Sequence, residues 1–130
     1  MRESARGGQV FKQFGKGRPR HVPGTMNKLE ADYYAHLEVL LWAREIEWFK
    51  FEAMTLKLAP DLRYTADFMV MLPDGTIELH EVKGGFIEGD AAVKMKAFAE
   101  AFPFRLVLVT RALKRDGGAW IYKTIGGDRE

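Results

Sequence analysis

The sequence predicts an α/β domain in which helices flank a mixed β-sheet, and three observations support this fold class. Residues 104–110 are almost entirely apolar and rich in branched side chains, as in a buried strand. The turn Pro73-Asp74-Gly75 separates two strand-like segments, which predicts a hairpin. A helix-like segment precedes residues 104–110, so we expect a right-handed crossover to a parallel strand. The predicted order of elements is therefore α-β-β-β-α-β.

Local patterns give the expected position of each element. The first helix is predicted over residues 27–46, where apolar residues recur at three- and four-residue spacings. After a glycine-rich break, Asp90 is placed to cap a second helix that ends at Phe102. The strands, predicted from aromatic, β-branched and alternating apolar residues, cover residues 48–58, 64–72, 76–83 and 104–110, and residues 119–125 would add an edge strand.

The composition is that of an ordinary soluble globular protein. The chain has 130 residues, enough for one domain with a real core, and it is 47% hydrophobic and 29% charged. It has no cysteine, which excludes disulfides and thiolate metal sites. No apolar stretch approaches the length of a membrane span, and the N-terminus lacks the hydrophobic region of a signal peptide. We therefore expect a cytoplasmic protein without a membrane partner.

Residues 1–24 are expected to form a basic arm rich in glycine and proline, followed by a single domain over residues 25–130. The arm holds six Lys or Arg residues against a single acid, and it has few apolar groups to bury. Such a segment suits a polyanion such as DNA, although a solvated tail has the same composition. The candidate phosphate-binding residues of the arm are Lys12, Lys16, Arg18 and Arg20.

Glu81-Val82-Lys83 carries the clearest chemical signal in the chain. Positions i and i+2 of a strand project from the same face, so the side chains of Glu81 and Lys83 should lie together. Asp67, in the other strand of the predicted hairpin, can reach the same place. A carboxylate, a hairpin turn and then carboxylate-x-lysine is the layout of a phosphodiesterase site that uses a hard metal ion. The alternatives are an ordinary solvated sheet face for the two acids and, for Lys83, an ion pair with a neighbouring acid across the strands.

With these residues in this order, the chain resembles the PD-(D/E)xK nuclease superfamily over about residues 27–110. The matching segments are Asn27-Lys28-Leu29-Glu30-Ala31, Tyr64-Thr65-Ala66-Asp67-Phe68 and His80-Glu81-Val82-Lys83-Gly84. Ala66 stands where the superfamily has its name-giving proline. The resemblance implies a restriction-endonuclease-like core. Within the superfamily, the chain most resembles small phage-encoded members of the endonuclease I type, which resolve Holliday junctions.

The resemblance also implies roles for the matching residues around Mg²⁺ or Mn²⁺. Asp67 and Glu81 would be direct ligands, with the main-chain carbonyl of Val82 as a third, because Mg²⁺ prefers hard oxygen ligands. Lys83 would orient or deprotonate the attacking water, and Glu30 would hold a second metal or a metal-bound water. Glu30 also fits a capping box with Asn27, so its role stays open.

Other candidate residues are assigned more simply. Lys94 lies on the second predicted helix, where a solvated face is the default and a contact with the scissile backbone is the functional alternative. His80 alternates away from Glu81, so we expect it in packing or at the surface rather than as a ligand. Gly84-Gly85 lacks the pattern of a phosphate-binding loop, and we expect no organic cofactor.

The sequence therefore predicts a metal-dependent DNA endonuclease, encoded by a phage or prophage, with Holliday-junction resolution as the preferred activity. Resolution needs paired incisions, which implies a homodimer. A nuclease that acts on flaps, nicks or single strands is a second enzymatic interpretation. A catalytically silent DNA-binding or packaging protein that retains the fold is an interpretation from another class.

Overall fold

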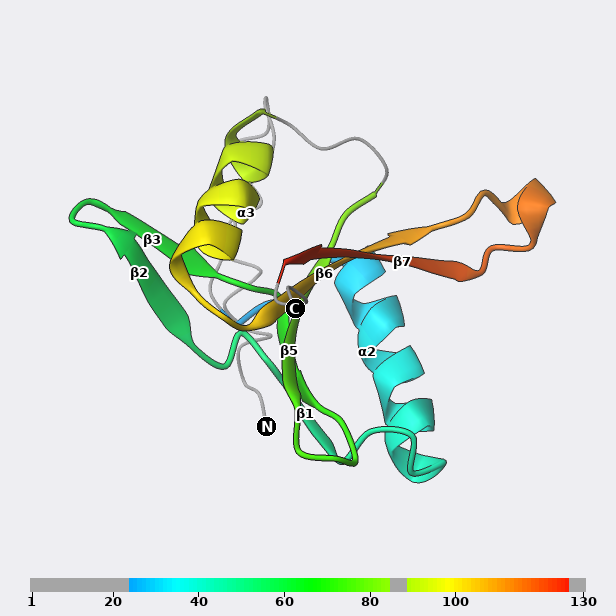
Figure 1. The fold of residues 1–130 in the computed structure, drawn as a ribbon. Coiled ribbons are helices and arrows are strands. Elements are labelled where there is room, and N and C mark those ends of the chain that lie inside the picture. The colour runs from blue at the N-terminus through cyan, green and yellow to red at the C-terminus, as the bar shows by residue number, and fades with distance from the viewer. Residues whose placement is uncertain (1–23, 85–88, 127–130) are drawn as a thin grey trace.

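A computed structural model of the chain describes residues 24–84 and 89–126, which form a mixed α/β structure (Figure 1). Helices α2 and α3 lie on opposite sides of a five-stranded sheet, and a separate two-stranded hairpin projects beside α3. The elements are α2 (Lys28–Trp42), β1 (Trp48–Phe51), β2 (Thr55–Ala59), β3 (Leu62–Thr65), β4 (Phe68–Met71), β5 (Ile77–Val82), α3 (Gly89–Ala101), β6 (Arg105–Arg111), η2 (Lys114–Asp116) and β7 (Trp120–Gly126).

The five-stranded sheet has the order β1-β4-β5-β6-β7 and is mixed. Strands β5 and β6 pair directly and in parallel, and α3 connects them in the chain; the other neighbouring strands pair antiparallel. The predicted parallel crossover strand, the β4–β5 hairpin and the additional edge strand are thus confirmed. The hairpin turn is stabilised where Asp74 Oδ1 accepts the Thr76 N–H at 2.9 Å, and Gly75 takes a φ of 91° that favours glycine.

The predicted strand over residues 48–58 is wrong, because the structure divides it between two sheets. Residues of β1 pair with β4 of the main sheet, whereas β2 pairs with β3 in the separate hairpin. Between them the chain bends at Glu52, whose φ is 46° and whose N–H donates to the Asp67 carbonyl at 2.7 Å. The apolar pattern continues through this bend, so the sequence alone shows no break.

The predicted strand over residues 64–72 is divided in the same way, at Ala66 and Asp67. Its first half belongs to β3 and pairs with β2, and its second half belongs to β4 and pairs with β1 and β5. The chain must therefore change sheets between Thr65 and Phe68. Asp67 sits at this break, outside either ladder, which lets its side chain turn toward the end of β5.

The helix boundaries also differ from the prediction. Helix α2 begins with the capping box of Asn27 and Glu30, as the sequence suggested, but it ends at Trp42 rather than at residue 46. Its end is a Schellman motif, in which Glu45 N–H donates to the Leu40 carbonyl at 2.8 Å and Arg44 takes a φ of 66°. Helix α3 begins at Gly89, so Asp90 lies inside its first turn and is not the cap.

The core consists of one buried cluster on each face of the sheet. Phe68 and Val70 of β4 pack with Tyr33 and Leu37 of α2. The other members of this cluster are Ile46, Val82 of β5, and Val107 and Val109 of β6. On the other face, Met95 and Phe98 of α3 pack against Tyr64, Leu79, Leu106 and Leu108. No helix among the described residues has the length and apolar character needed to span a membrane.

Candidate functional site

Asp67, Glu81 and Lys83 converge where β5 ends beside the break between β3 and β4. The Oδ2 atom of Asp67 accepts the main-chain N–H of Val82 at 2.8 Å, which ties Asp67 to the end of β5. The Nζ atom of Lys83, the residue that follows β5, lies 3.3 Å from Glu81 Oε2, so these i and i+2 side chains meet as their spacing predicted. Lys83 thus pairs with an acid two residues before it.

Both carboxyl groups are removed from solvent. Asp67 is 9% exposed and Glu81 is 7% exposed, so the alternative of a solvated sheet face is wrong for both. Burial, followed by the charges of Glu81 and Glu30, raises the pKa of Asp67 to about 9. Burial also raises the pKa of Glu81, although hydrogen bonds from Tyr64 and Lys83 oppose this effect. Two buried carboxyl groups whose ionisation is disfavoured by burial, and for Asp67 also by the charge of Glu81, form a place where positive charge is stabilised.

Tyr64 is a member of this cluster that the sequence did not reveal. It is buried on β3, and its hydroxyl donates to Glu81 Oε1 at 2.6 Å. Burial, together with the charge of Glu81, raises the pKa of Tyr64 well above its usual range, so the hydroxyl keeps its proton and donates. Glu81 is therefore held by Tyr64 through one oxygen and by Lys83 through the other.

Glu30 forms the capping box and also lies close to the acid pair. Its N–H donates to Asn27 Oδ1 at 2.8 Å, and its Oε1 accepts the Asn27 N–H at 3.0 Å. Glu30 is nevertheless buried, and its charge contributes to the raised pKa of Asp67. The two roles that the sequence left open are thus compatible, because only one carboxylate oxygen is used by the cap.

A groove of about 730 Å³ opens beside Glu81 and Lys83, between β3 and the first turns of α3. Lys94 of α3 lines it together with Arg63 and Thr65 of β3, and Asp90 adds one acid to the lining. Lys94 therefore shares this groove with Glu81 and Lys83. The other candidate phosphate-binding residues, Lys12, Lys16, Arg18 and Arg20, lie outside the described part of the chain.

A second polar cluster lies on the α2 face of the sheet. The His80 ring bonds with the Tyr33 hydroxyl at 2.7 Å and with Glu78 Oε1 at 2.9 Å, and Arg105 donates to Glu78 Oε2 at 2.8 Å. His80 is buried, so of the two expectations for it, packing is correct and surface exposure is wrong. It faces away from Glu81, as alternation along β5 requires.

The residues that converge fit a hard divalent cation such as Mg²⁺. Within residues 24–84 and 89–126, no group of three or more His, Cys, Asp or Glu side chains is placed to hold a metal. Mg²⁺ usually needs only one or two carboxylates, because it keeps several waters and takes other oxygens from the substrate. Asp67 and Glu81 are such a pair, and a cation would offset the cost of their burial and the effect of the Glu81 charge on Asp67.

Sequence reasoning missed the residues of β3 that line the groove. Arg63 and Thr65 alternate on the exposed face of that strand, which is a detectable signal, but their pairing with β2 is not visible locally. Tyr64 gave no signal, because its bond to Glu81 joins residues that are distant in sequence and on different sheets.

Comparison with known proteins gives one match. Residues 25–117 match the model of a family described as "Protein of unknown function (DUF1064)", which covers more than half of the chain. No curated protein and no solved structure matches the chain.

Proposed function

The chain belongs to the DUF1064 family, and we propose that it is a DNA endonuclease that depends on Mg²⁺ or Mn²⁺. The observation that carries the proposal is the convergence of Asp67, Glu81 and Lys83 beside a groove lined by further cations. Buried carboxylates with raised pKa values are expected at functional sites, and two of them beside a lysine suit phosphodiester hydrolysis.

Each residue of the cluster has a role in this proposal. A divalent metal ion held by Asp67, Glu81 and the carbonyl of Val82 would supply Lewis-acid stabilisation of the phosphate charge and activation of water. Lys83 orients the attacking water or neutralises the developing charge, and a compact ammonium suits this role. Tyr64 fixes one oxygen of Glu81, so that the carboxylate keeps its orientation. Lys94 binds the phosphate backbone beside the scissile bond.

The order of elements supports a restriction-endonuclease-like core. The main sheet and its helices follow one another as α2, β1, β4, β5, α3 and β6, which is α-β-β-β-α-β. The β2–β3 hairpin is then an insertion between the first two strands of the core. The narrower proposal, a phage-encoded enzyme that resolves Holliday junctions as a homodimer, rests on the sequence resemblance rather than on the order of elements.

The proposal is tested by cleavage of a panel of labelled DNA substrates with Mg²⁺, with Mn²⁺ and with EDTA. The panel contains a four-way junction, a flap, a duplex and a single strand. We expect metal-dependent cleavage of at least one substrate, and preferred cleavage of the junction supports the narrower proposal. Binding of DNA without cleavage of any substrate would contradict the enzymatic function and favour the silent DNA-binding protein.

Replacing Glu30 by glutamine separates its two roles. The amide oxygen of the introduced glutamine can still accept from Asn27 N–H, so we expect an unchanged or slightly raised melting temperature. The charge near Asp67 is lost, so we expect cleavage to fall by about 10- to 100-fold, as for residues that support metal ligands. Thermal melting and cleavage rates check this, with Glu30→Ala as the control that removes cap and charge together. Full cleavage by Glu30→Gln would make Glu30 a cap only.

A further inference from the structure

The β2–β3 hairpin has one face packed on the domain and one face open to solvent. Leu56 and Leu58 of β2 and Tyr64 of β3 belong to the packed face, which covers the core cluster of α3. The residues between them are exposed. A two-stranded hairpin is only marginally stable by itself, so packing of this face against the domain explains why the hairpin forms. The packing does not account for the residue types on the open face.

The open face carries two cross-strand pairs. Thr55 lies opposite Thr65, and their hydroxyl groups bond at 2.6 Å. Lys57 lies directly opposite Arg63, and both side chains are exposed. Like charges in directly opposite positions destabilise a sheet. Among the described residues neither cation has an ion-pair partner, so no ion pair there offsets this repulsion.

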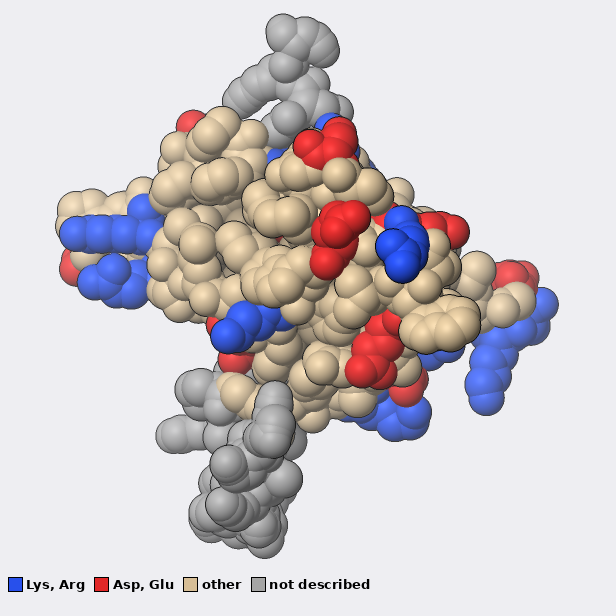
Figure 2. Space-filling view, turned by 90° about the horizontal axis from the view of Figure 1, so that it is seen from below, with Lys and Arg blue, Asp and Glu red and all other residues tan. Residues whose placement is uncertain are grey.

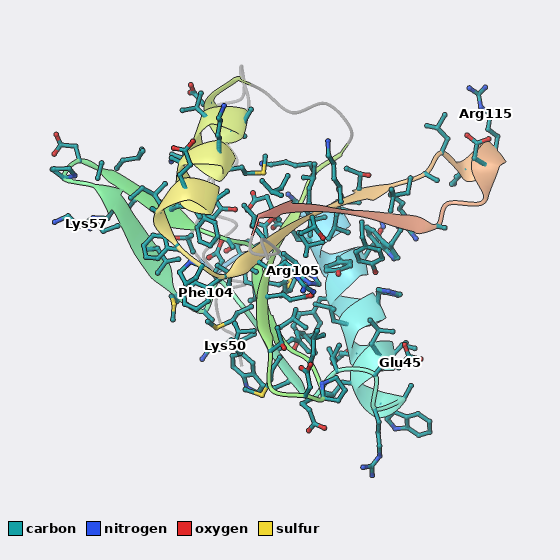
Figure 3. The ribbon with its side chains drawn as sticks, in the orientation of Figure 1. Glu45, Lys50, Lys57, Phe104, Arg105 and Arg115 are labelled. Carbon is teal, nitrogen blue, oxygen red and sulfur yellow. The ribbon has the colours of Figure 1, made fainter. Side chains whose placement is uncertain are left out.

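These cations stand at an extremity of the molecule and are continuous with the groove. Figure 2 shows basic side chains gathered at the left-hand end, where Figure 1 places the β2–β3 hairpin, and Lys57 points outward there in Figure 3. Arg63 and Thr65 also line the groove that contains Glu81 and Lys83. Residues that lie directly opposite each other in an antiparallel pair have Cβ atoms about 4.5 to 5.5 Å apart, so the long side chains of Lys57 and Arg63 can reach neighbouring phosphates of one DNA strand.

We propose that the open face of the β2–β3 hairpin binds the sugar–phosphate backbone of DNA that leaves the groove, through Lys57 and Arg63. This inference rests on the proposed function, because it takes its occupant from the nucleic acid in the groove. An exposed pair of cations that repel each other is stabilised by a polyanion. The Thr55–Thr65 bond keeps the two strands in register below the cations.

The test measures the salt dependence of binding of the full chain to a labelled DNA duplex in EDTA, so that no cleavage occurs. The Lys57→Gln/Arg63→Gln variant should lower the slope of log affinity against log salt by about 2, because each lost phosphate contact removes about 0.9. The matched control is Lys114→Gln/Arg115→Gln, which removes two exposed cations from η2. Figure 3 places Arg115 at the end of the molecule opposite Lys57. This control should keep the wild-type slope.

Two further measurements show whether a lower slope comes from a folding defect rather than from lost phosphate contacts. The charge-keeping variant Lys57→Arg/Arg63→Lys should restore the wild-type slope. Without DNA, Lys57→Gln/Arg63→Gln should melt slightly higher than the wild type at low salt and equally at high salt, because repulsion between the two cations is screened.

The possible outcomes distinguish failure of the hairpin proposal from failure of the endonuclease proposal. A wild-type slope in Lys57→Gln/Arg63→Gln, or an equal loss in the η2 control, would overturn the role of the hairpin and leave the endonuclease proposal intact. Absence of metal-dependent cleavage by the wild type would overturn the endonuclease proposal. The slopes still decide the role of the hairpin in that case, since binding is measured without metal.

Discussion

Asp67→Asn is expected to slow cleavage about 10³-fold and, at the same time, to raise the melting temperature of the metal-free protein. Asparagine keeps an oxygen that can accept from Val82 N–H, so the tie between the β3–β4 break and β5 remains. It removes a carboxylate that the proposed metal ion needs, and loss of several kcal/mol of charge stabilisation corresponds to about a 10³-fold slower reaction.

The rise in stability follows from the buried position of Asp67. Burial and the neighbouring acids raise the pKa of Asp67 to about 9, so the folded protein must either protonate this group or hold a desolvated charge. Asparagine avoids this cost, which we expect to be on the order of 2 kcal/mol, or roughly 5 to 10 °C in melting temperature. Thermal melting in EDTA and cleavage with Mg²⁺ measure the two effects.

The destabilising effect of buried Asp67 should also depend on pH. Between the unfolded pKa of 3.8 and the folded pKa of about 9, the folded state holds more protons on Asp67 than the unfolded state does. The contribution of Asp67 to the free energy of unfolding must therefore decrease as the pH rises through this window. We expect the gain from Asp67→Asn to be small near pH 4 and larger toward pH 9. A variant that melts below the wild type at neutral pH would contradict this account.

His80→Leu is expected to cause a large loss of stability. Leucine fits an apolar site, but it cannot bond with the Tyr33 hydroxyl or with Glu78. Glu78 keeps its bond with Arg105, but each buried polar atom that loses a hydrogen bond costs about 1 to 3 kcal/mol. We therefore expect a loss of about 2 to 4 kcal/mol and a melting temperature roughly 10 °C lower. Chemical denaturation with a linear extrapolation measures the free energy of unfolding.

A double variant is the control for His80→Leu. Tyr33→Phe/His80→Leu removes the hydroxyl whose bond with His80 the single variant breaks, so it should be more stable than the sum of the single losses predicts. Glu78 adds a pH test, because its hydrogen bond with His80 is the largest cause that lowers its pKa. A group with a lowered pKa stabilises the fold above its unfolded pKa of 4.5, and this stabilisation is lost as the pH falls. The cost of His80→Leu should thus shrink in acid. A cost below about 1 kcal/mol at neutral pH would show that the cluster is not a structural element.

Local patterns were enough to predict the parts of the fold that depend on neighbours in sequence. The capping box of Asn27 and Glu30 and the turn at Asp74-Gly75 are formed by residues within four positions of each other. The branched apolar residues of β6 predicted a buried strand, and the intervening helix predicted its parallel pairing with β5. Residues that act through near neighbours leave a periodic or spaced signal.

The two chain breaks were not predictable, because both depend on distant pairing. Residues 48–58 and 64–72 each have a continuous apolar pattern, yet each is divided between two sheets. Whether a strand continues depends on the partner that accepts its hydrogen bonds, and that partner lies elsewhere in the chain. The same break lets Asp67 reach Val82, so the geometry of the candidate site depends on an event that the sequence pattern hides.

By itself the sequence determined the α/β class and the two-residue spacing that brings Glu81 and Lys83 together, and it indicated Asp67 as the candidate second acid. These follow from residue types and from the two-residue period of a strand. Only the tertiary structure decided that the two acids are buried, that Tyr64 holds Glu81, and that Lys57 and Arg63 face each other on an open hairpin. Burial and electrostatic repulsion depend on what surrounds a group in space, and most of those surroundings come from segments that are far away in the sequence.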